Sequence, residues 1–400
     1  MKSSTHGNGA RSLPRLLFLF ADDRFFWSHR LPMARAALRN GYEVIVATGV
    51  YAFGEEIKAE GFRLIQLDFT RKTRSLFNEL RAIREIRSTY KKEQPDIVHQ
   101  VAIKPVLFGS IAAVGLERRP VINALTGLGY LVASSSKKAS FLRSMVWRIF
   151  RSLLGGAHQR VLVENQDDRD LVVSRLAVPE NRVIVTRGSG VDIKEFPESD
   201  EPAGIPVVAL AARMLWIKGI ADFVAAAGLL RKMGIRARFV LVGDSDANNP
   251  SCVPREQLLE WDKNGQVEWW GHQQDMPALF KKVSLVCLPS HGGEGVPKVL
   301  MEAAASGRAI VTTDVPGCRE VVRSGINGVL VQPRDVQALA GAIEHLVQDA
   351  QLRQRMGKRS RELAVAEFSE DAVIRQTLTV YDEMLHSFRP TLKPALEVGN

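Results

Sequence analysis

A glycine-rich stretch followed by a helical pattern holds residue types that could bind and transform a ligand. It runs from His291 to Gly307 and contains two carboxylates, Glu294 and Glu302, eight residues apart. The apolar run 283–288 before it predicts a buried strand, and Pro297 suits the first turn of a helix. A strand, a glycine-rich loop and a helix present free backbone amides and a positive helix dipole at one point. The stretch therefore predicts an anion site, above all for a phosphate.

Two interpretations of the carboxylates are open from this stretch alone. In the first, they belong to a nucleotide-sugar site, where one carboxylate binds the sugar and the other binds the ribose. In the second, Lys298 and Glu302 form a surface ion pair at a spacing of four residues, and Glu294 is only a loop residue.

A second candidate lies at the end of another apolar run, 206–211. Arg213 and Lys218 are five residues apart on a short loop before a helical pattern. Arg can bind two phosphate oxygens at once and Lys supplies a compact charge, so the pair could neutralise a pyrophosphate. Two solvated loop cations would give the same pattern. The position favours a site, because Glu294 should also lie at the carboxyl end of a strand.

The elements that must position these residues alternate between short apolar runs and longer amphipathic ones. Predicted strands cover 16–20, 43–47, 97–99, 120–123, 160–164, 183–186, 206–211, 237–243, 266–270, 284–288, 309–312 and 328–331. Predicted helices cover 32–40, 76–91, 106–114, 220–233 and 371–387. This alternation predicts βαβ units and parallel sheets with helices on both faces.

The pattern restarts halfway, which predicts an α/β protein of two Rossmann-like, doubly wound domains facing a central cleft. Residues 1–13 are expected to be a disordered tail. The N-terminal domain is expected at 14–190 and the C-terminal domain at 191–370, joined at the Gly/Ser turn 187–192. A last helix, 371–388, is expected to pack back on the N-terminal domain.

Composition narrows the class of protein. Residues 1–190 hold 30 Lys and Arg against 17 Asp and Glu, and the remainder holds 24 against 27. Only the first half is therefore expected to meet an anionic surface or substrate. Three unclustered cysteines indicate a reducing compartment and no metal site. No apolar stretch reaches the roughly 18 residues of a spanning helix, which favours a cytoplasmic chain that is soluble or peripheral.

An ordered series of motifs carries a resemblance to a known family. The second half contains Arg213 with Lys218, the strand 239–244 ending in Gly-Asp, the segment 269–272 and Pro289-Ser290 before Glu294-x7-Glu302. The series resembles the retaining glycosyltransferases of family 4, which have the GT-B fold. Motifs at 25–32, 96–105, 123–129 and 188–192 are similar to the bacterial branch that adds N-acetylgalactosamine to undecaprenyl-diphosphate-linked sugars. The likeness spans about residues 14–385.

The resemblance implies roles for the C-terminal domain as the nucleotide-sugar-binding half. Arg213 and Lys218 would hold the donor diphosphate and stabilise charge on the departing nucleotide. Glu294 would bind the donor sugar's hydroxyls, and Glu302 those of the ribose. The other implied donor-site residues are Gly295, Val296 and Pro297 through their backbone, Trp270, Gly271 and His272 near the base, and Ser290.

The N-terminal domain would be the acceptor side, and each of its candidates has a plainer alternative. His99 is expected to end a strand at the cleft as a catalytic residue, or to be a satisfied structural histidine. Lys104 could meet an acceptor phosphate, or be an ordinary cation at a helix start. Thr126 and Gly127 could form an acceptor loop, or a turn that needs glycine.

Many relatives have a Gly-Gly loop after the first strand, whereas this chain has Phe26-Trp27-Ser28-His29. Two interpretations of the replacement are open: a segment that touches donor or acceptor, or a helix start. We favour Ser28 as the N-cap of a helix that begins near Arg30.

The implied reaction is retaining transfer of a hexose or N-acetylhexosamine from a UDP-sugar to a lipid-linked, polyprenyl-diphosphate glycan acceptor. The resemblance implies no metal and no cofactor, and Asp244-Ser-Asp246 is interpreted as a turn. A non-catalytic sugar-nucleotide or membrane-surface binding protein is the alternative. Nucleic-acid binding is disfavoured because no recognition motif appears, and a dinucleotide oxidoreductase because the first strand lacks G-x-G-x-x-G.

An anionic inner-membrane surface is the expected partner of the basic half. In segment 137–154, an apolar face made by Leu142, Met145, Val146, Ile149 and Leu153 lies opposite Lys137, Arg148 and Arg151. Such a helix could lie on lipid or cover a sheet. The cationic helix 81–91 adds weight to a peripheral location on the inner membrane face.

Overall fold

The computed structural model describes residues 13–69, 76–116, 119–128, 137–246, 249, 251–293 and 295–388. These residues divide into two compact units. The first unit contains the described residues up to Ala124, Gly156–Arg160 and those from Thr377 on, and the second contains Leu125–Gly155 and Val161–Gln376. Residues 1–12 of the predicted tail lie outside the described residues. The domain boundaries expected at 190 and 370 stay a prediction.

The first sheet has seven strands in the order β3-β2-β1-β4-β5-β6-β7. Its strands are β1 (Arg15–Leu19), β2 (Glu43–Thr48), β3 (Arg63–Gln66), β4 (Ile97–Val101), β5 (Val121–Leu125), β6 (Gln159–Val163) and β7 (Val183–Val185). The described pairings are parallel, and β1 lies between β2 and β4. Chain order therefore runs outward from β1 in both directions, as in a doubly wound sheet.

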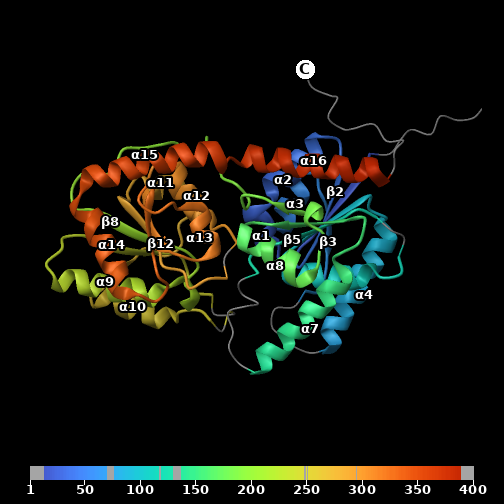
Figure 1. The fold of residues 1–400 in the computed structure, drawn as a ribbon, viewed down its shortest axis with the longest axis horizontal. Coiled ribbons are helices and arrows are strands. Elements are labelled where there is room, and N and C mark those ends of the chain that lie inside the picture. Colours follow the sequence, from blue (N-terminus) through green and yellow to red (C-terminus); the bar gives the residue numbers. More distant parts are fainter. Residues whose placement is uncertain are drawn as a thin grey trace, which may run out of the picture. The chain divides into compact units, whose positions relative to one another are not determined.

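Helices cover both faces of this sheet (Figure 1). They are α1 (Asp23–His29), α2 (Leu31–Arg39), α3 (Gly54–Ala59), α4 (Leu76–Glu93), α5 (Ile103–Ala113), α7 (Lys137–Leu153), α8 (Gln166–Leu176) and α16 (Glu370–Phe388). Successive side chains of β1 point to opposite faces of the sheet. Leu17 joins a buried cluster with Ile86 of α4 and Phe108 of α5. Phe18 points the other way, against Phe26 of α1.

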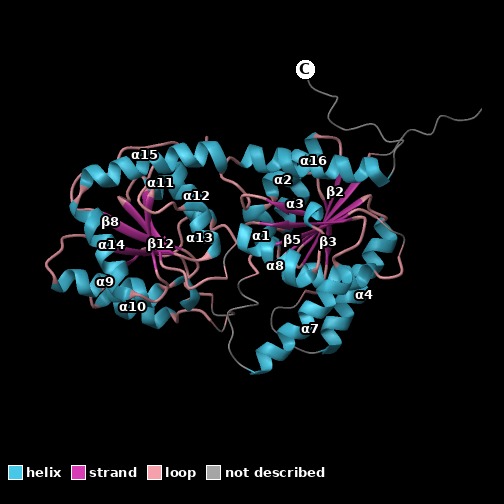
Figure 2. Cartoon of the chain, in the orientation of Figure 1, coloured by secondary structure: helices cyan, strands magenta, loops and turns pink. Residues whose placement is uncertain are grey.

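The second sheet has six strands in the order β10-β9-β8-β11-β12-β13. They are β8 (Val207–Ala211), β9 (Arg238–Val242), β10 (Glu268–Trp269), β11 (Leu285–Leu288), β12 (Ala309–Thr313) and β13 (Gly328–Val331). Its helices are α9 (Ile220–Lys232), α10 (Arg255–Lys263), α11 (Met276–Phe280), α12 (Lys298–Ala305), α13 (Pro316–Val321), α14 (Val336–Gln348) and α15 (Ala350–Glu367). Figure 2 shows that the strands of each sheet are flanked by helices on both faces.

Two buried clusters sandwich this second sheet. Ala209 of β8 belongs to the cluster on one face, together with Leu300 of α12. Leu210, the next residue, belongs to the cluster on the other face, with Phe223 of α9 and Ile343 of α14. Both faces of the strand are apolar because both are covered, which explains the continuous apolar runs in the sequence. The predicted α/β class of two doubly wound sheets is confirmed.

The segment after β1 corrects one prediction. Ser28 is not an N-cap, because it lies inside α1 and its hydroxyl donates to the carbonyl oxygen of Arg24 at 2.7 Å. Asp22 caps α1 instead, accepting from the Arg24 amide at 2.9 Å. The following helix, α2, begins at Leu31 with no side-chain cap. A carboxylate three residues after the end of β1 starts the helix earlier than the sequence suggested.

Helix α7 packs through a face that overlaps the predicted one only in part. In its described part, Trp147 and Phe150 are buried, whereas Met145 is 43% exposed. The other described members of the predicted face are half-buried, namely Val146, Ile149 and Leu153. Arg148 and Arg151 are exposed, as predicted. These positions match the interpretation of a packed helix, with the buried face centred on the two aromatic residues. None of the described helices is both long enough and apolar enough to cross a membrane.

Candidate active site

The loops that follow β8 and β11 contact each other in the second unit. The two strands are parallel neighbours, with Leu285 paired to Val208. The amide of His291 donates to the carbonyl oxygen of Ile217 at 2.8 Å. Gly219 has φ +74°, and a Cβ there would lie 2.0 Å from the carbonyl oxygen of Pro289. Glycine is therefore required where the two loops touch.

The two predicted cations lie on the first of these loops. Arg213 follows β8 and is exposed, and Lys218 closes the short 3₁₀ turn Trp216–Lys218 before α9. The contact at Gly219 thus brings the Arg213–Lys218 loop to the loop that begins at Pro289. The carboxyl ends of two adjacent parallel strands form the usual ligand edge of an open α/β sheet.

Helix α12 carries the second carboxylate. Pro297 is its N-cap residue, with φ −65°. Glu302 is only 8% exposed, and its carboxylate lies 3.7 Å from the ammonium group of Lys298. Burial raises the pKa of Glu302. The expected i, i+4 ion pair is therefore present, but it holds a buried carboxylate and is not a surface pair. Glu294 lies outside the described residues.

Ser290 stabilises the turn between β11 and the glycine pair 292–293. It is buried, and its hydroxyl accepts from the amide of Gly292 at 3.4 Å and donates to the carbonyl oxygen of Ile217 at 3.5 Å. These contacts hold the loop in shape. Its predicted role in binding substrate stays a prediction.

A carboxylate that the sequence analysis did not predict contacts the glycine-rich loop. The amide of Val296 donates to Oε2 of Glu164 at 3.0 Å. Glu164 follows β6 and is 7% exposed. A Cβ on Gly295 would lie 1.8 Å from the same oxygen, so the contact requires glycine at that position. Glu164 is the last residue of the predicted strand 160–164, and the polar run 165–168 that follows it was the available sequence signal.

The predicted acceptor loop lies close to this carboxylate. Thr126 and Gly127 follow β5, and the amide of Leu128 donates to Oδ2 of Asp168 at 3.3 Å. Burial raises the pKa of Asp168 to about 6, and the nearby charge of Glu164 adds to the rise. The amide nitrogen of Gly127 lies 3.5 Å from the position that a Gly295 Cβ would take. The structure therefore brings Gly127 and Gly295 together.

In the segment 270–272, the backbone of Gly271 and the side chain of Trp270 have different surroundings. The carbonyl oxygen of Gly271 accepts from the Gly243 amide at 2.8 Å, and His272 is exposed. The Trp270 indole instead donates to Glu268 at 3.0 Å and lines a cavity with Val207 and Arg238. Because those two residues begin β8 and β9, the cavity lies at the amino edge of the sheet. The Trp270 side chain therefore points to the opposite edge of the sheet from the candidate site, and the role of the segment near the base stays a prediction.

His99 does not end its strand as expected. It is the middle residue of β4, is 2% exposed, and its Nδ1 lies 2.5 Å from the hydroxyl of Tyr381 on α16. Burial lowers the pKa of His99 to about 3. The ring also lies 5.3 Å from that of Phe18. The enclosed ring matches the alternative of a structural histidine, although its Nε2 has no hydrogen-bond partner among the described residues.

Lys104 is held by protein contacts in the first unit. Its ammonium group pairs with Glu79 at 3.2 Å and lies 5.1 Å from the ring centre of Phe108. An acceptor phosphate would have to compete with both. Its predicted phosphate role therefore stays a prediction.

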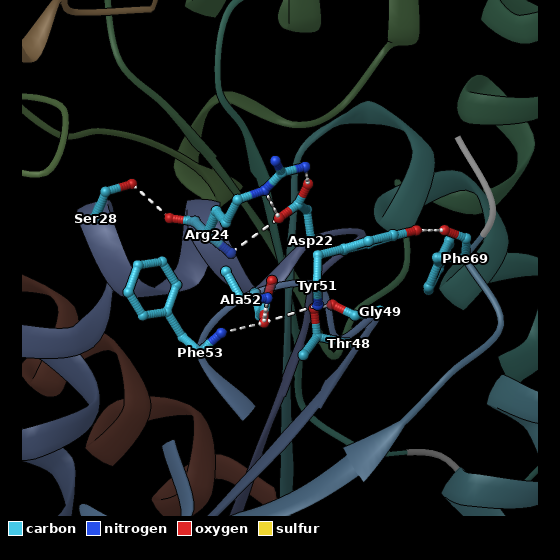
Figure 3. A network of polar contacts seen from close by, with 10 residues as sticks. Asp22, Arg24, Ser28, Thr48, Gly49, Tyr51, Ala52, Phe53 and Phe69 are labelled. Carbon is cyan, nitrogen blue, oxygen red and sulfur yellow. Dashed lines mark hydrogen bonds and ion pairs between the residues drawn. The ribbon is translucent and has the colours of Figure 1, made fainter. Parts of the chain in front are cut away.

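A polar network lies beyond the carboxyl ends of β1 and β2 (Figure 3). One oxygen of Asp23 accepts from the amides of Tyr51, Ala52 and Phe53 at 2.7–3.0 Å. Arg24 pairs with Asp22 at 2.8 Å and lies 5.4 Å from the ring centre of Tyr51. The Tyr51 hydroxyl donates to the carbonyl oxygen of Phe69. The sequence did not single out Asp22, Asp23 or Tyr51, although two carboxylates directly after a strand were a signal.

Comparison with known proteins identifies the family. A model described as "Glycosyl transferase 4-like" matches residues 15–159, and one described as "Glycosyl transferases group 1" matches residues 205–349. The chain belongs to the glycosyltransferase family. A relative from Campylobacter jejuni is named N,N'-diacetylbacillosaminyl-diphospho-undecaprenol alpha-1,3-N-acetylgalactosaminyltransferase. It is 27% identical over 93% of this chain and 99% of its own.

Solved glycosyltransferase structures share the fold. Sucrose-phosphate synthase from Thermosynechococcus elongatus matches with a TM-score of 0.77 at 19% identity, over 94% of this chain and 100% of its own. Anabaena HepE, solved in complex with UDP, matches with a TM-score of 0.72 at 20% identity, over 92% and 100%. The predicted GT-B class of this glycosyltransferase is therefore confirmed. Among its described residues, no group of three His, Cys, Asp or Glu could hold a metal ion.

Proposed function

We propose that this glycosyltransferase moves a hexose or N-acetylhexosamine, with retention, from a UDP-sugar to a lipid-linked polyprenyl-diphosphate glycan acceptor. The observation that supports this most is the contact between the loop of Arg213 and Lys218 and the glycine-rich loop, at the carboxyl ends of β8 and β11. Two cations beside backbone amides match the charge of a nucleoside diphosphate. The UDP complex of HepE favours uridine as the nucleoside.

In the donor site, Arg213 and Lys218 neutralise the diphosphate and stabilise the negative charge that develops on the departing nucleotide. Glu302 accepts hydrogen bonds from the ribose hydroxyls, which replace the water that burial removed from its carboxylate. Glu294 binds the donor sugar. Transfer with retention lets the leaving phosphate accept the proton of the acceptor hydroxyl, so the proposed reaction uses neither metal nor cofactor.

The acceptor assignment is supported by the relatives. The Campylobacter jejuni relative is named for an undecaprenol-linked acceptor and covers nearly the whole of this chain. In the second unit, the loop of Thr126 and Gly127 beside Gly295 gives the acceptor sugar a place next to the donor. We therefore assign this loop to the acceptor, in the assembly of a surface polysaccharide such as capsule or lipopolysaccharide.

Helix α4 supports a peripheral location on the inner membrane face. Phe77 is 69% exposed and Leu80 is 52% exposed. Arg84 and Lys91 are also exposed and lie on the same stripe of the helix, at spacings of seven and fourteen residues from Phe77. Exposed apolar side chains beside cations match the interface of an anionic bilayer.

Transfer by the purified protein tests this function. The protein would be incubated with UDP-glucose, UDP-galactose and their N-acetylated forms, each with a polyprenyl-diphosphate-linked sugar. Mass spectrometry should show one added hexose or N-acetylhexosamine, and NMR should show the α-linkage retained from the donor. UDP binding without turnover on any acceptor would instead support the non-catalytic binding protein.

A further inference from the structure

The carboxylate of Glu164 accepts a hydrogen bond from the backbone of Val296, which the family resemblance assigns to the donor site. Its Oε2 accepts from the Val296 amide at 3.0 Å, one residue before the N-cap Pro297 of α12. We propose that Glu164 is an internal anion that holds this amide in the nucleotide-free enzyme, and that the donor diphosphate displaces it. This inference rests on the proposed function, because it assumes that the Val296 amide serves a donor phosphate.

Glu164 and a donor phosphate would compete for the Val296 amide for two reasons: the amide has one hydrogen, and both competitors are negatively charged. An amide has one hydrogen, so a carboxylate at 3.0 Å and a phosphate oxygen cannot both accept it well. Two anions at one amide would also repel each other. A ligand displaces the carboxylate only if it gains other contacts, such as those proposed for Arg213 and Lys218. A diphosphate meets this condition and an uncharged nucleoside does not.

The contact is built into the fold on both sides. Gly295 leaves the space that the carboxylate fills, since a Cβ there would lie 1.8 Å from Oε2. On the other side, Asn165 caps α8 by accepting from the Asp168 amide at 2.7 Å, and it donates to the Asp168 carboxylate at 2.9 Å. This cap fixes the backbone directly after Glu164. The backbone that carries Glu164 is therefore held in place, and its side chain is buried but can still rotate away when a ligand binds.

The proposed role of Glu164 predicts that its removal strengthens donor binding. Removing a residue that binds donor or supports the loop weakens donor binding, whereas removing a competing anion strengthens it. Glu164→Ala should therefore bind UDP more tightly than wild type, by about tenfold for one hydrogen bond to a charged group. Glu164→Gln, which keeps the volume but not the charge, should show a smaller gain. The same variants should bind uridine as wild type does.

Calorimetry of the full chain tests this with UDP and uridine as probes, after thermal unfolding shows that each variant is folded. Asp167→Asn is the matched control, because it removes one negative charge three residues on, from an exposed pair with Arg319 at 3.3 Å. Tighter UDP binding by both Glu164 variants, but not by the control, supports the proposal. Unchanged or weaker binding, in protein whose wild type binds UDP through Arg213, overturns it and leaves the proposed function intact. A wild type that binds no UDP overturns both.

Discussion

The amide of His291 and the carbonyl oxygen of Ile217 are joined by a hydrogen bond of 2.8 Å. This bond ties the glycine-rich loop to the turn that carries Lys218, although the two residues are 74 positions apart in the chain. His291 is also held through its ring, whose Nε2 lies 2.7 Å from Asp222 of α9. The candidate donor site therefore depends on loop geometry as much as on its charged side chains.

Gly219→Ala should loosen this contact. A Cβ would lie 2.0 Å from the Pro289 carbonyl oxygen, and φ is +74°. We expect the free energy of unfolding to fall by about 2–4 kcal/mol and UDP binding to be lost, measured by denaturant titration and calorimetry. Gly228→Ala, in the middle of α9 with open space around it, is the control. It should raise the free energy of unfolding by about 0.5–1 kcal/mol. Equal effects of the two substitutions would contradict the argument.

Glu302→Gln should reduce the preference of the protein for UDP over 2'-deoxy-UDP. If the buried carboxylate accepts from the ribose hydroxyls, wild type should bind UDP about tenfold more tightly than 2'-deoxy-UDP. The variant should narrow this ratio to about threefold or less, because a neutral acceptor binds a hydroxyl less strongly. Glu362→Gln is the control, since Glu362 also pairs with a cation on its own helix, Arg359, but on the exposed side of α15. A ratio that survives in Glu302→Gln would remove the ribose assignment.

His99 predicts how stability changes with pH. Its pKa is lowered to about 3 in the folded chain, so between pH 3 and the ordinary value of 6.5 the unfolded chain binds more protons. The free energy of unfolding therefore falls on acidification below about pH 6.5, by about 2 kcal/mol at pH 5 from this group. Thermal or urea unfolding at pH 7 and pH 5 measures it. His99→Gln should lose less stability over that range than wild type, and an equal loss would exclude His99 as the cause.

Helix α4 predicts membrane binding. Replacing both Phe77 and Leu80 by Asp should lower partitioning onto vesicles rich in phosphatidylglycerol by at least about tenfold, because two exposed apolar side chains are lost and two negative charges are gained. Cosedimentation measures this, with phosphatidylcholine vesicles for comparison. Met233→Asp, at a 57% exposed position after α9, is the control. Unchanged cosedimentation of the double variant would remove α4 from the interface.

Local patterns were sufficient to predict most strands. Apolar runs mark strands that helices cover on both faces, as Val207–Ala211 is covered, and the predicted bounds differ from the observed ones by one or two residues. The strand Arg63–Gln66 was missed because it lies at the edge of its sheet and has exposed ends, so it carries no apolar run. Pairing with β2, and not its own residues, makes this segment a strand.

Long-range contacts limited prediction of the site. The second-unit motifs placed Arg213 and Lys218 at the correct strand end, because strand ends can be read from the sequence. Glu164 was missed since its partner, Val296, is 132 residues away. The polar run 164–168 marks a candidate locally, but it does not show which residue is the partner. His99 was placed at a strand end because the apolar run stops there, whereas pairing with β1 and β5 carries β4 on to Val101.

Arg213→Ala is the substitution that tests the central claim most directly. It would be assayed for UDP affinity by calorimetry and for sugar transfer from UDP-sugar to a polyprenyl-diphosphate-linked acceptor. Arg236→Ala, an exposed arginine just before the amino end of β9, is the control for charge and size. The account predicts that Arg213→Ala lowers kcat/KM by at least about a hundredfold and weakens UDP binding, while Arg236→Ala changes neither. Transfer and UDP binding at the wild-type level in folded Arg213→Ala protein would contradict the account.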